Sequence, residues 1–276
     1  MPVFLAAVVL SVPAVVHIWR SDRHAPAAPT VARVEVAWVA EDGLTPLVRP
    51  GDSLQAGQEV ASGEQGRLAI RLASGPSVRL DKQTNIRILS RQILMLDRGA
   101  VYVDSGSRHQ DRARTVEVQT PLGSIRDMGA VYEVRTRPGL LLVRVRAGAV
   151  SIKDSEGLLR LGAGYELAVD SSGRTVRRRL VSYAPEWSWV ASVTPPMDLE
   201  GRSLREFLDW MARERGLRLE FASASLARIA PETMLNGSIE GMSLDDALAS
   251  VLAAAGMRYG IHGDALIVYT LADWEP

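Results

Sequence analysis

The chain has 276 residues, with 32 basic and 32 acidic side chains and no cysteine. The balanced charge speaks against a nucleic-acid partner, because such proteins carry a basic surface. The lack of cysteine excludes disulfides, a thiolate nucleophile and cysteine-based metal sites, and the length allows two modest domains with a core each.

An apolar run opens the chain. Residues 1–19 contain no Asp, Glu, Lys or Arg, and as a helix they would extend roughly 28 Å, close to the ~30 Å hydrocarbon core of a bilayer. We therefore predict a transmembrane anchor at 1–19. It would make the protein a single-pass protein of the inner membrane, with the bulk of the chain in the periplasm.

Two features complicate this prediction. Pro13 lies inside the run, and Arg20 and Arg23 come after it with no basic residue in front, which by the positive-inside rule favours a cytoplasmic location for the rest of the chain. Further N-terminal residues in the natural chain would resolve the conflict. A cleaved signal peptide, with the small residues 25–27 as its cleavage pattern, and a buried helix are the alternatives.

Residues 31–183 alternate apolar and polar side chains in short runs, as at 68–72, 78–80 and 143–146. A period of two with one apolar face is typical of half-buried strands. Glycines interrupt these runs at intervals of roughly 8 to 12 residues, as turns do. We predict a mainly β domain over 31–183, either a sandwich or a solenoid-like stack.

Residues 184–196 have a composition that disfavours both helix and central strand, since they include Pro185, Pro195 and Pro196. We predict an ordered linker here. Trp187 and Trp189 of this linker and Trp210 beyond it stand out because aromatic residues are scarce. Packing of the linker against the first helix of the C-terminal part is one interpretation, and partner binding by these three tryptophans is the other.

An internal repeat occupies residues 197–270. Residues 199–221 align without a gap with residues 239–261, an offset of 40. Each copy has a strand end, a helix with one apolar stripe and a strand. We predict a small α+β domain of two βαβ-like repeats.

The ends of both predicted helices carry specific signals. Ser203 and Ser243 are placed as N-caps, and Glu206 completes a capping box with Ser203. Gly216 and Gly256 supply the left-handed residue that ends a helix. These signals predict helices that begin just after each serine and end just before each glycine.

Short motifs in the β region carry a family resemblance. They are Gly-Ala-Val-Tyr-Val at 99–103, Val-Gln-Thr-Pro-Leu-Gly at 118–123, Gly-Ala-Val-Tyr-Glu-Val at 129–134 and Val-Arg-Val-Arg-Ala-Gly-Ala-Val at 143–150. They resemble the FecR domain, named for a membrane-bound sensor of iron–siderophore uptake. Ala130 and Tyr132 stand where the family usually has Thr and Phe, and both changes keep strand chemistry.

The repeat carries a second resemblance. The pattern Gly-x-Ser-Leu-x-x-x-Leu occurs at 201–208 and again at 241–248. It is similar to the short N-terminal domain of secretins and TonB-dependent transporters, known as STN.

Together the resemblances imply a periplasmic sensor or adaptor of iron-uptake signalling. Its partner would be the signalling domain of a TonB-dependent outer-membrane transporter, and the signal would pass towards a sigma factor. FecR proteins carry a cytoplasmic domain before the anchor, whereas this chain begins at the anchor. We therefore expect these residues to lack the sigma-regulating domain.

No group of side chains in the sequence predicts catalysis, a metal or a cofactor. The four histidines show no metal-ligand spacing: His17, His24, His109 and His262. Turn and edge positions explain the aspartates that could otherwise form an acid–base pair: Asp81, Asp97 and Asp104. With no nucleophile elbow or phosphate loop either, we predict that the protein is not an enzyme.

Arginines recur along the predicted strands, at Arg126, Arg135, Arg137, Arg144 and Arg146. A solvated strand face explains them, and a patch for an acidic partner is the sharper interpretation. The chain carries 25 Lys and Arg against 19 Asp and Glu up to position 196, and 7 against 13 after it. The C-terminal part could therefore supply the acids.

Protein–protein contact is thus the predicted function, with strand addition at an exposed sheet edge as its mode. The alternative is a cell-envelope module that binds glycan or peptidoglycan without a signalling role. Glycan sites usually present exposed aromatic side chains, and the β region offers Trp38, Tyr102, Tyr132 and Tyr165.

Overall fold

A computed structural model describes residues 28–38, 48–106, 114–154 and 157–271. The predicted anchor at 1–19 lies outside the described residues. Within the described ranges, no helix is both long and apolar enough to cross a membrane.

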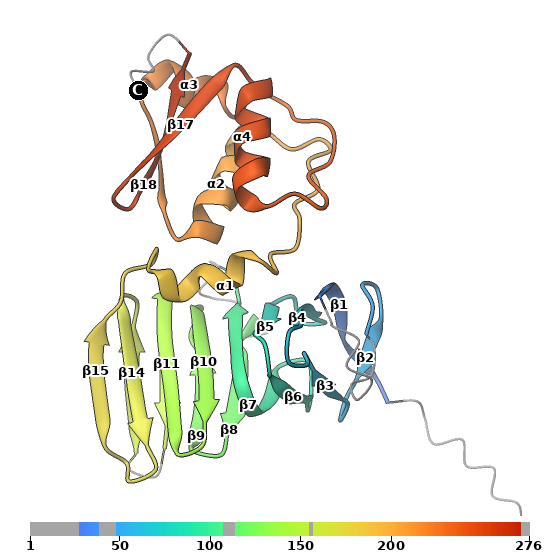
Figure 1. Cartoon of the computed structure of the whole chain (residues 1–276), viewed down its shortest axis with the longest axis vertical. Coiled ribbons are helices and arrows are strands. Elements are labelled where there is room, and N and C mark those ends of the chain that lie inside the picture. The colour runs from blue at the N-terminus through green and yellow to red at the C-terminus, as the bar shows by residue number, and fades with distance from the viewer. Residues whose placement is uncertain (1–27, 39–47, 107–113, 155–156, 272–276) are drawn as a thin grey trace, which may run out of the picture.

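Fifteen strands form the larger unit of the described chain (Figure 1). In chain order they are β1 (Thr30–Trp38), β2 (Ser53–Gln55), β3 (Glu59–Ala61), β4 (Arg67–Leu72), β5 (Ser77–Leu80), β6 (Asn85–Ile88), β7 (Ile93–Asp104), β8 (Glu117–Thr120), β9 (Gly123–Asp127), β10 (Val131–Arg137), β11 (Leu140–Ala147), β12 (Ala149–Lys153), β13 (Leu158–Gly162), β14 (Tyr165–Asp170) and β15 (Thr175–Arg179).

The strands divide into two layers that share β7. Sheet A has the order β2-β1-β4-β5-β7-β10-β11-β14-β15. Sheet B has the order β3-β6-β7-β8-β9-β12-β13. The first half of β7 pairs with β6 and β8 in sheet B, and its second half, from Gly99 to Asp104, pairs with β10 in sheet A.

Glycines sit where the chain crosses from one layer to the other. Gly99, in the middle of β7, has φ of 91°, and a β-carbon there would lie 2.5 Å from the Cα of Thr84. Gly148, between β11 and β12, has φ of 72°, and a β-carbon would lie 2.3 Å from the carbonyl oxygen of Gly129. Only glycine combines such a positive φ with such a close backbone approach.

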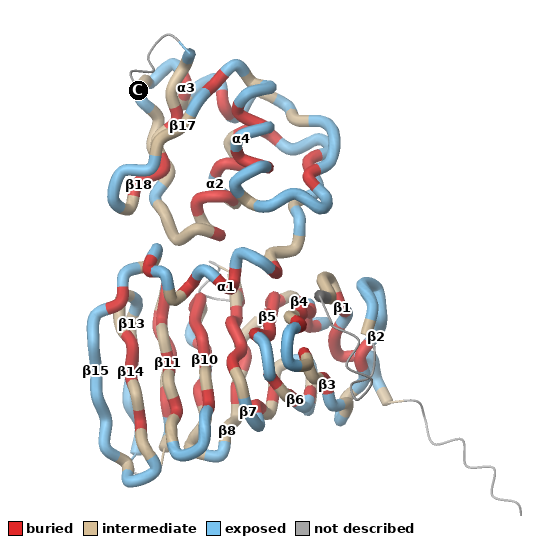
Figure 2. Tube along the Cα trace, in the orientation of Figure 1, coloured by how far each residue is buried: buried red, intermediate tan, exposed pale blue. Residues whose placement is uncertain are grey.

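One apolar core lies between the two sheets. It contains side chains of sheet A, such as Leu68 and Val143, together with side chains of sheet B, such as Ile86, Val118 and Ile152. Buried and less buried residues alternate along many strands, as in β6 and β11 (Figure 2). The prediction of a mainly β fold is confirmed, and the two-layer arrangement is that of a sandwich.

The linker is more regular than its prolines predict. Pro185–Trp187 form a 3₁₀ turn, η2, and Ser188–Ala191 form a short helix, α1. Proline fits here because Pro185 occupies the first turn, where no backbone donor is needed. The expectation that this composition resists helix was therefore wrong for these seven residues.

The C-terminal unit places helices against a three-stranded sheet. Helix α2 (Leu204–Arg215) leads into β16 (Arg218–Phe221) and α3 (Ala224–Ile229), and α4 (Leu244–Ala254) leads into β17 (Met257–His262) and β18 (Ala265–Thr270). The sheet order is β16-β18-β17, with β16 parallel and β17 antiparallel to β18. This unit has its own apolar core.

The repeat is visible in the positions of its helices. Both helices begin 40 residues apart, at Leu204 and Leu244, and Ser203 and Ser243 cap them as predicted. The strand expected before each helix does not form. Gly201 and Gly241 have positive φ there and turn the chain just before each cap, so the unit is not built from two βαβ-like repeats.

Candidate functional site: the junction of the two units

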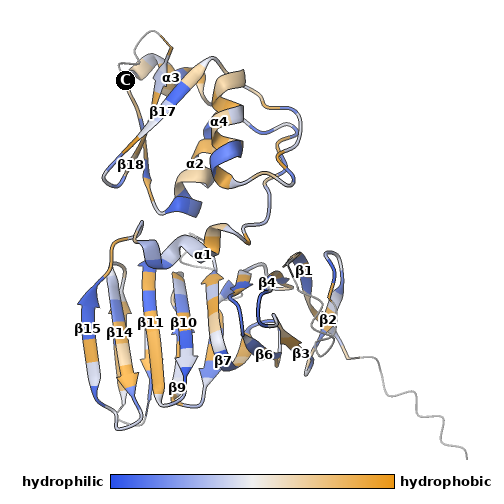
Figure 3. Cartoon of the chain, viewed as in Figure 1, coloured by the Kyte–Doolittle hydropathy of each residue, from blue (hydrophilic) through white to orange (hydrophobic). Residues whose placement is uncertain are grey.

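A row of polar side chains crosses the outer face of sheet A. Each member is paired with the next across neighbouring strands, from β5 through β7, β10, β11 and β14 to β15: Arg79, Tyr102, Glu133, Arg144, Glu166 and Arg178. Side chains of one face alternate with core residues along a strand, and Figure 3 shows the hydrophilic bands within the strands of this sheet. The row therefore faces away from the sandwich core.

Ion pairs join the middle of this row. Glu133 is fully buried, and its carboxylate accepts hydrogen bonds from Arg135 at 2.8 Å and from Arg144 at 3.3 Å. Arg144 also donates to Glu166 at 2.6 Å. Burial would raise the pKa of Asp81, but hydrogen bonds from Arg67 and Arg135 hold that pKa below its usual value.

The first member of the row reaches the C-terminal unit. Arg79 donates two hydrogen bonds to the carboxylate of Glu214 on α2, at 2.7 and 2.9 Å, and the two side chains are 2% and 6% exposed. Burial by itself lowers the pKa of Arg79, but the charge of Glu214 outweighs it and the pKa lies above the usual value. The pair is a charge-assisted, bidentate contact between the two units.

Two further arginines complete the junction. Arg146 of β11 donates to the carbonyl oxygen of Glu214 at 3.0 Å and to that of Ser182 at 2.7 Å. Arg213, the neighbour of Glu214 on α2, forms an ion pair with Asp104 at the end of β7, at 3.0 Å from Nε. Charged groups of both units are therefore satisfied by groups of the other.

The junction brings two backbones into contact. The hydroxyl of Ser182 donates to the carbonyl oxygen of Gly216 at 2.6 Å. A β-carbon on Gly216 would lie 2.1 Å from the carbonyl oxygen of Ser182 and 2.5 Å from Nε of Arg146. The glycine that ends helix α2 is thus also the point where the C-terminal unit meets the end of sheet A.

The linker tryptophans lie against the outer face of sheet A. Trp187 is 3% exposed, donates to the carbonyl oxygen of Val181 at 3.0 Å and meets the ring of Tyr102 edge-on at 6.0 Å. Trp189 is also buried and donates to Glu133 at 3.4 Å. The two tryptophans therefore pack on the sandwich and are covered by the chain itself, while Thr194 of the linker contacts the first helix of the C-terminal unit by donating a hydrogen bond to Glu214 at 3.3 Å.

Trp210 lies apart from the linker pair. It is half-buried in the C-terminal core, and its ring centroid is 5.9 Å from that of Phe207. It lines a cleft of about 1040 Å³ between the linker, β1 and the C-terminal unit, together with Trp187. Exposed apolar residues also line this cleft: Tyr183, Met242 and Ile261. Partner binding by the three tryptophans stays a prediction.

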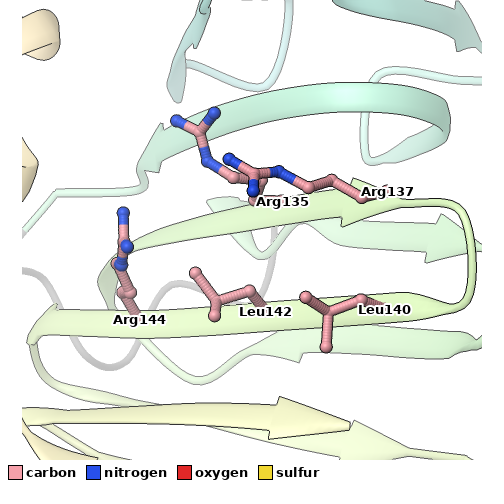
Figure 4. A pocket seen from close by; sticks show the side chains of 5 residues that line it. All are labelled: Arg135, Arg137, Leu140, Leu142 and Arg144. Carbon is pink, nitrogen blue, oxygen red and sulfur yellow. The ribbon is translucent and has the colours of Figure 1, made fainter. Parts of the chain in front are cut away.

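A smaller hollow of about 330 Å³ lies over the β10–β11 hairpin (Figure 4). Leu140 and Leu142 lie between three arginines there. Arg135 and Arg144 are engaged in ion pairs, and only Arg137 has no acidic partner among the described residues. The predicted arginine face is thus largely neutralised by acids of the sandwich, and of its five arginines Arg146 alone contacts the C-terminal unit among the described residues.

The structure places the predicted aspartates in separate surroundings. Asp81 pairs with Arg67 and Arg135, Asp104 pairs with Arg213, and Asp97 is exposed on β7. Within the described ranges, no group of three or more metal-ligating side chains comes together. The junction offers ion pairs and apolar contacts, and these chemistries hold protein surfaces together.

Sequence reasoning missed the central pair of the junction. Glu214 lies on the apolar stripe of its helix, three and seven positions after Met211 and Phe207. A single acidic residue among the apolar positions of a helix could have indicated a buried charged partner. The sequence around Arg79 carried no such signal, because a charged residue between two apolar ones is ordinary at an outward-facing strand position.

Comparison with known proteins identifies part of the sandwich. Residues 58–151 match the family model described as FecR protein, so the resemblance to this family is confirmed for that stretch. No curated protein matches the chain. The resemblance of the C-terminal repeat to the STN domain stays a prediction.

Two solved structures are similar in shape. Both are of a protein from Parabacteroides distasonis provisionally assigned as an anti-sigma factor, at 1.65 and 2.50 Å resolution. Each has 15% sequence identity and a TM-score of 0.43, and the match covers 77% of this chain and 99% or 98% of the other.

Proposed function

We propose that the protein is a FecR-like regulatory protein that acts through contacts with another protein. The family match at 58–151 supports the regulatory class. The observation that carries the proposal is the junction, where a buried bidentate pair between Arg79 and Glu214 fixes the C-terminal unit on sheet A. A partner that binds the C-terminal unit can therefore affect the sandwich through this junction.

In this proposal the protein is a periplasmic adaptor held in the inner membrane by residues 1–19. The partner is the signalling domain of a TonB-dependent outer-membrane transporter, as the resemblance of the repeat to the STN domain implies. The apolar composition of residues 1–19 supports the anchor.

The contact surface in this proposal is the β17 edge of the C-terminal sheet. Among the described residues β17 pairs only with β18, so its other edge is open. Ile261 on this strand is 43% exposed. An open edge with an exposed apolar side chain can accept an extended segment of a partner as an additional strand.

Site-specific photo-crosslinking tests this proposal in native envelopes. A photoreactive amino acid replaces Ile261 in the full chain, and a matched variant carries it at Leu158, a 76% exposed residue of β13. Crosslinked products are identified by mass spectrometry. We expect a TonB-dependent transporter to be captured from position 261 and not from position 158.

Two results contradict the proposal. Capture of cell-wall glycan from both positions would favour the envelope-binding alternative. Capture of the transporter from position 158 alone would show that the contact lies on the sandwich and not on the C-terminal repeat.

A further inference from the structure

Strand β15 ends sheet A and is uncovered on both faces. All five of its residues are exposed (Figure 2). In the described part of the chain, sheet B ends one strand earlier, at β13, which contacts β14. Among the described residues, β15 has one neighbour, β14, and one open edge.

The register shows which backbone groups face this open edge. Leu180 donates to the carbonyl oxygen of Gly164, and Asp170 donates to that of Arg174. In an antiparallel pair the residues that bond the neighbour alternate with those that point away. The N–H and C=O groups of Thr175, Arg177 and Arg179 therefore point to the open edge.

Two of these residues, Arg177 and Arg179, carry positive charges that no acidic side chain balances among the described residues. Arg177 lies over the ring of Tyr165 at 3.7 Å, and Arg179 lies 6.0 Å from that ring. No acidic side chain of the described residues pairs with either arginine. Arg178, on the opposite face, differs because it is held by Glu166 and Glu186.

Charged edge strands often serve only to prevent aggregation. This edge does exclude a second copy of itself, because an antiparallel pair of β15 strands would place arginine opposite arginine, and like charges in that position are destabilising. The same arrangement favours an acidic strand. Acids at alternate positions would face Arg177 and Arg179, and an apolar residue would face Val176, which is 61% exposed.

We propose that β15 is a docking edge for an acidic extended segment of a partner protein, which adds to sheet A as an antiparallel strand. The segment has the pattern acid, polar, acid, apolar, read from the residue opposite Arg179 to the residue opposite Val176. This surface is separate from the β17 edge, and the two can fail independently.

A designed peptide tests the proposal with the full chain. The probe is fluorescein-labelled Gly-Thr-Glu-Thr-Glu-Val-Thr-Gly, and binding is measured by fluorescence anisotropy. A second peptide, Gly-Thr-Thr-Glu-Glu-Val-Thr-Gly, has the same charge but places its two acids on opposite faces of a strand. We expect the first peptide to bind about two- to fivefold more tightly than the second.

Variants separate strand addition from simple charge attraction. Thr175→Pro removes one outward N–H without removing a bond to β14, and Thr175→Ala keeps that N–H. We expect Thr175→Pro to weaken binding of the first peptide by at least about fivefold and Thr175→Ala by less than about twofold. The double variant Arg177→Glu and Arg179→Glu should abolish binding, while Arg258→Glu on β17 should leave it unchanged.

Three outcomes would overturn the proposal. Equal binding of the two peptides, or equal effects of the two Thr175 variants, would show that charge attraction alone binds the peptide, without strand addition. Binding of phosphatidylglycerol vesicles that depends on Arg177 and Arg179, without peptide binding, would assign the patch to a membrane surface. Self-association that Thr175→Pro abolishes would assign the edge to a second copy. Circular dichroism confirms that each variant is folded.

Discussion

Arg79 and Glu214 lie 135 residues apart in the sequence and form a bidentate ion pair that is buried between the two units. Removing two charges from water costs several kcal/mol, and the attraction between them only roughly offsets that cost. We therefore expect the pair to add little net stability, whereas the loss of one partner would leave an uncompensated buried charge.

The first prediction concerns this pair. Glu214→Leu leaves the buried charge of Arg79 without an acidic partner, and we expect it to lower the free energy of unfolding by about 3–5 kcal/mol. The double variant Arg79→Met with Glu214→Leu should recover most of that loss, because neither charge remains. Urea unfolding of the single and double variants measures both effects. If the double variant loses as much stability as Arg79→Met and Glu214→Leu lose in sum, the two side chains do not act as a pair.

The second prediction compares the glycines that end the two repeated helices. Gly216 and Gly256 have nearly the same φ, 69° and 67°, but only Gly216 lies against another backbone. Gly256→Ala should cost about 1–2 kcal/mol, the strain of a left-handed residue. Gly216→Ala should cost a further 1–3 kcal/mol or so, because its β-carbon would displace Ser182 and Arg146. Equal losses in thermal unfolding would show that the junction tolerates the extra carbon.

The third prediction concerns pH. Burial raises the pKa of Asp127, although its Oδ1 accepts a hydrogen bond from the amide of Ala130 at 2.7 Å. A carboxyl whose pKa is higher in the folded state stabilises that state below the unfolded pKa, near about 4, and loses this contribution as the pH rises through the folded value. Asp127 therefore destabilises the fold at neutral pH.

Asp127→Asn keeps an oxygen that can accept the hydrogen bond from Ala130 but removes the charge. Comparing the variant with the natural protein therefore measures how the charge of Asp127 changes stability. The variant should gain stability relative to the natural protein as the pH rises from 4 to 7. Urea unfolding at several pH values measures the difference, in which the contributions of Asp81 and Glu166 cancel. A difference that stays constant over this range would show that Asp127 titrates as an ordinary surface carboxyl.

The fourth prediction compares the two helix caps. Ser203 and Glu206 form a complete capping box, with hydrogen bonds of 3.2 and 2.9 Å, and Ser203 is buried. Ser243 accepts one backbone hydrogen bond and is exposed. Ser203→Ala should cost about 1–2 kcal/mol and Ser243→Ala about 0.5–1 kcal/mol. A larger loss in thermal unfolding for Ser243→Ala than for Ser203→Ala would contradict the assignment of the capping box to Ser203 and Glu206.

Local signals in the sequence predicted local structure well. The alternation at 143–146 predicted a strand, and β11 contains it; the serines at 203 and 243 predicted the starts of α2 and α4. These features depend on neighbours in the chain, so the sequence alone contains them. The strand predicted before each helix failed because Gly201 and Gly241 turn the backbone there.

The junction could not be predicted in the same way. Its ion pairs, Arg79 with Glu214 and Arg213 with Asp104, join residues more than 100 positions apart, and which residues meet depends on the register of six strands. Trp187 and Trp189 were recognised as unusual, but composition does not show which surface covers a side chain. The charge difference between the two parts of the chain named neither Arg79 nor Glu214, and the ion pair of Arg213 with Asp104 has the reverse polarity, with the acid on the sandwich.

Strand β7 gives the sandwich a mechanical property. It begins at Ile93 in one layer, bends at Gly99 and ends at Asp104 in the other layer, where Arg213 of the C-terminal unit holds it. Because β7 belongs to both sheets, the layers cannot separate along it without breaking its hydrogen bonds to one of them. A force that acts on the C-terminal unit and is transmitted through Arg213 is therefore carried along one backbone into both layers.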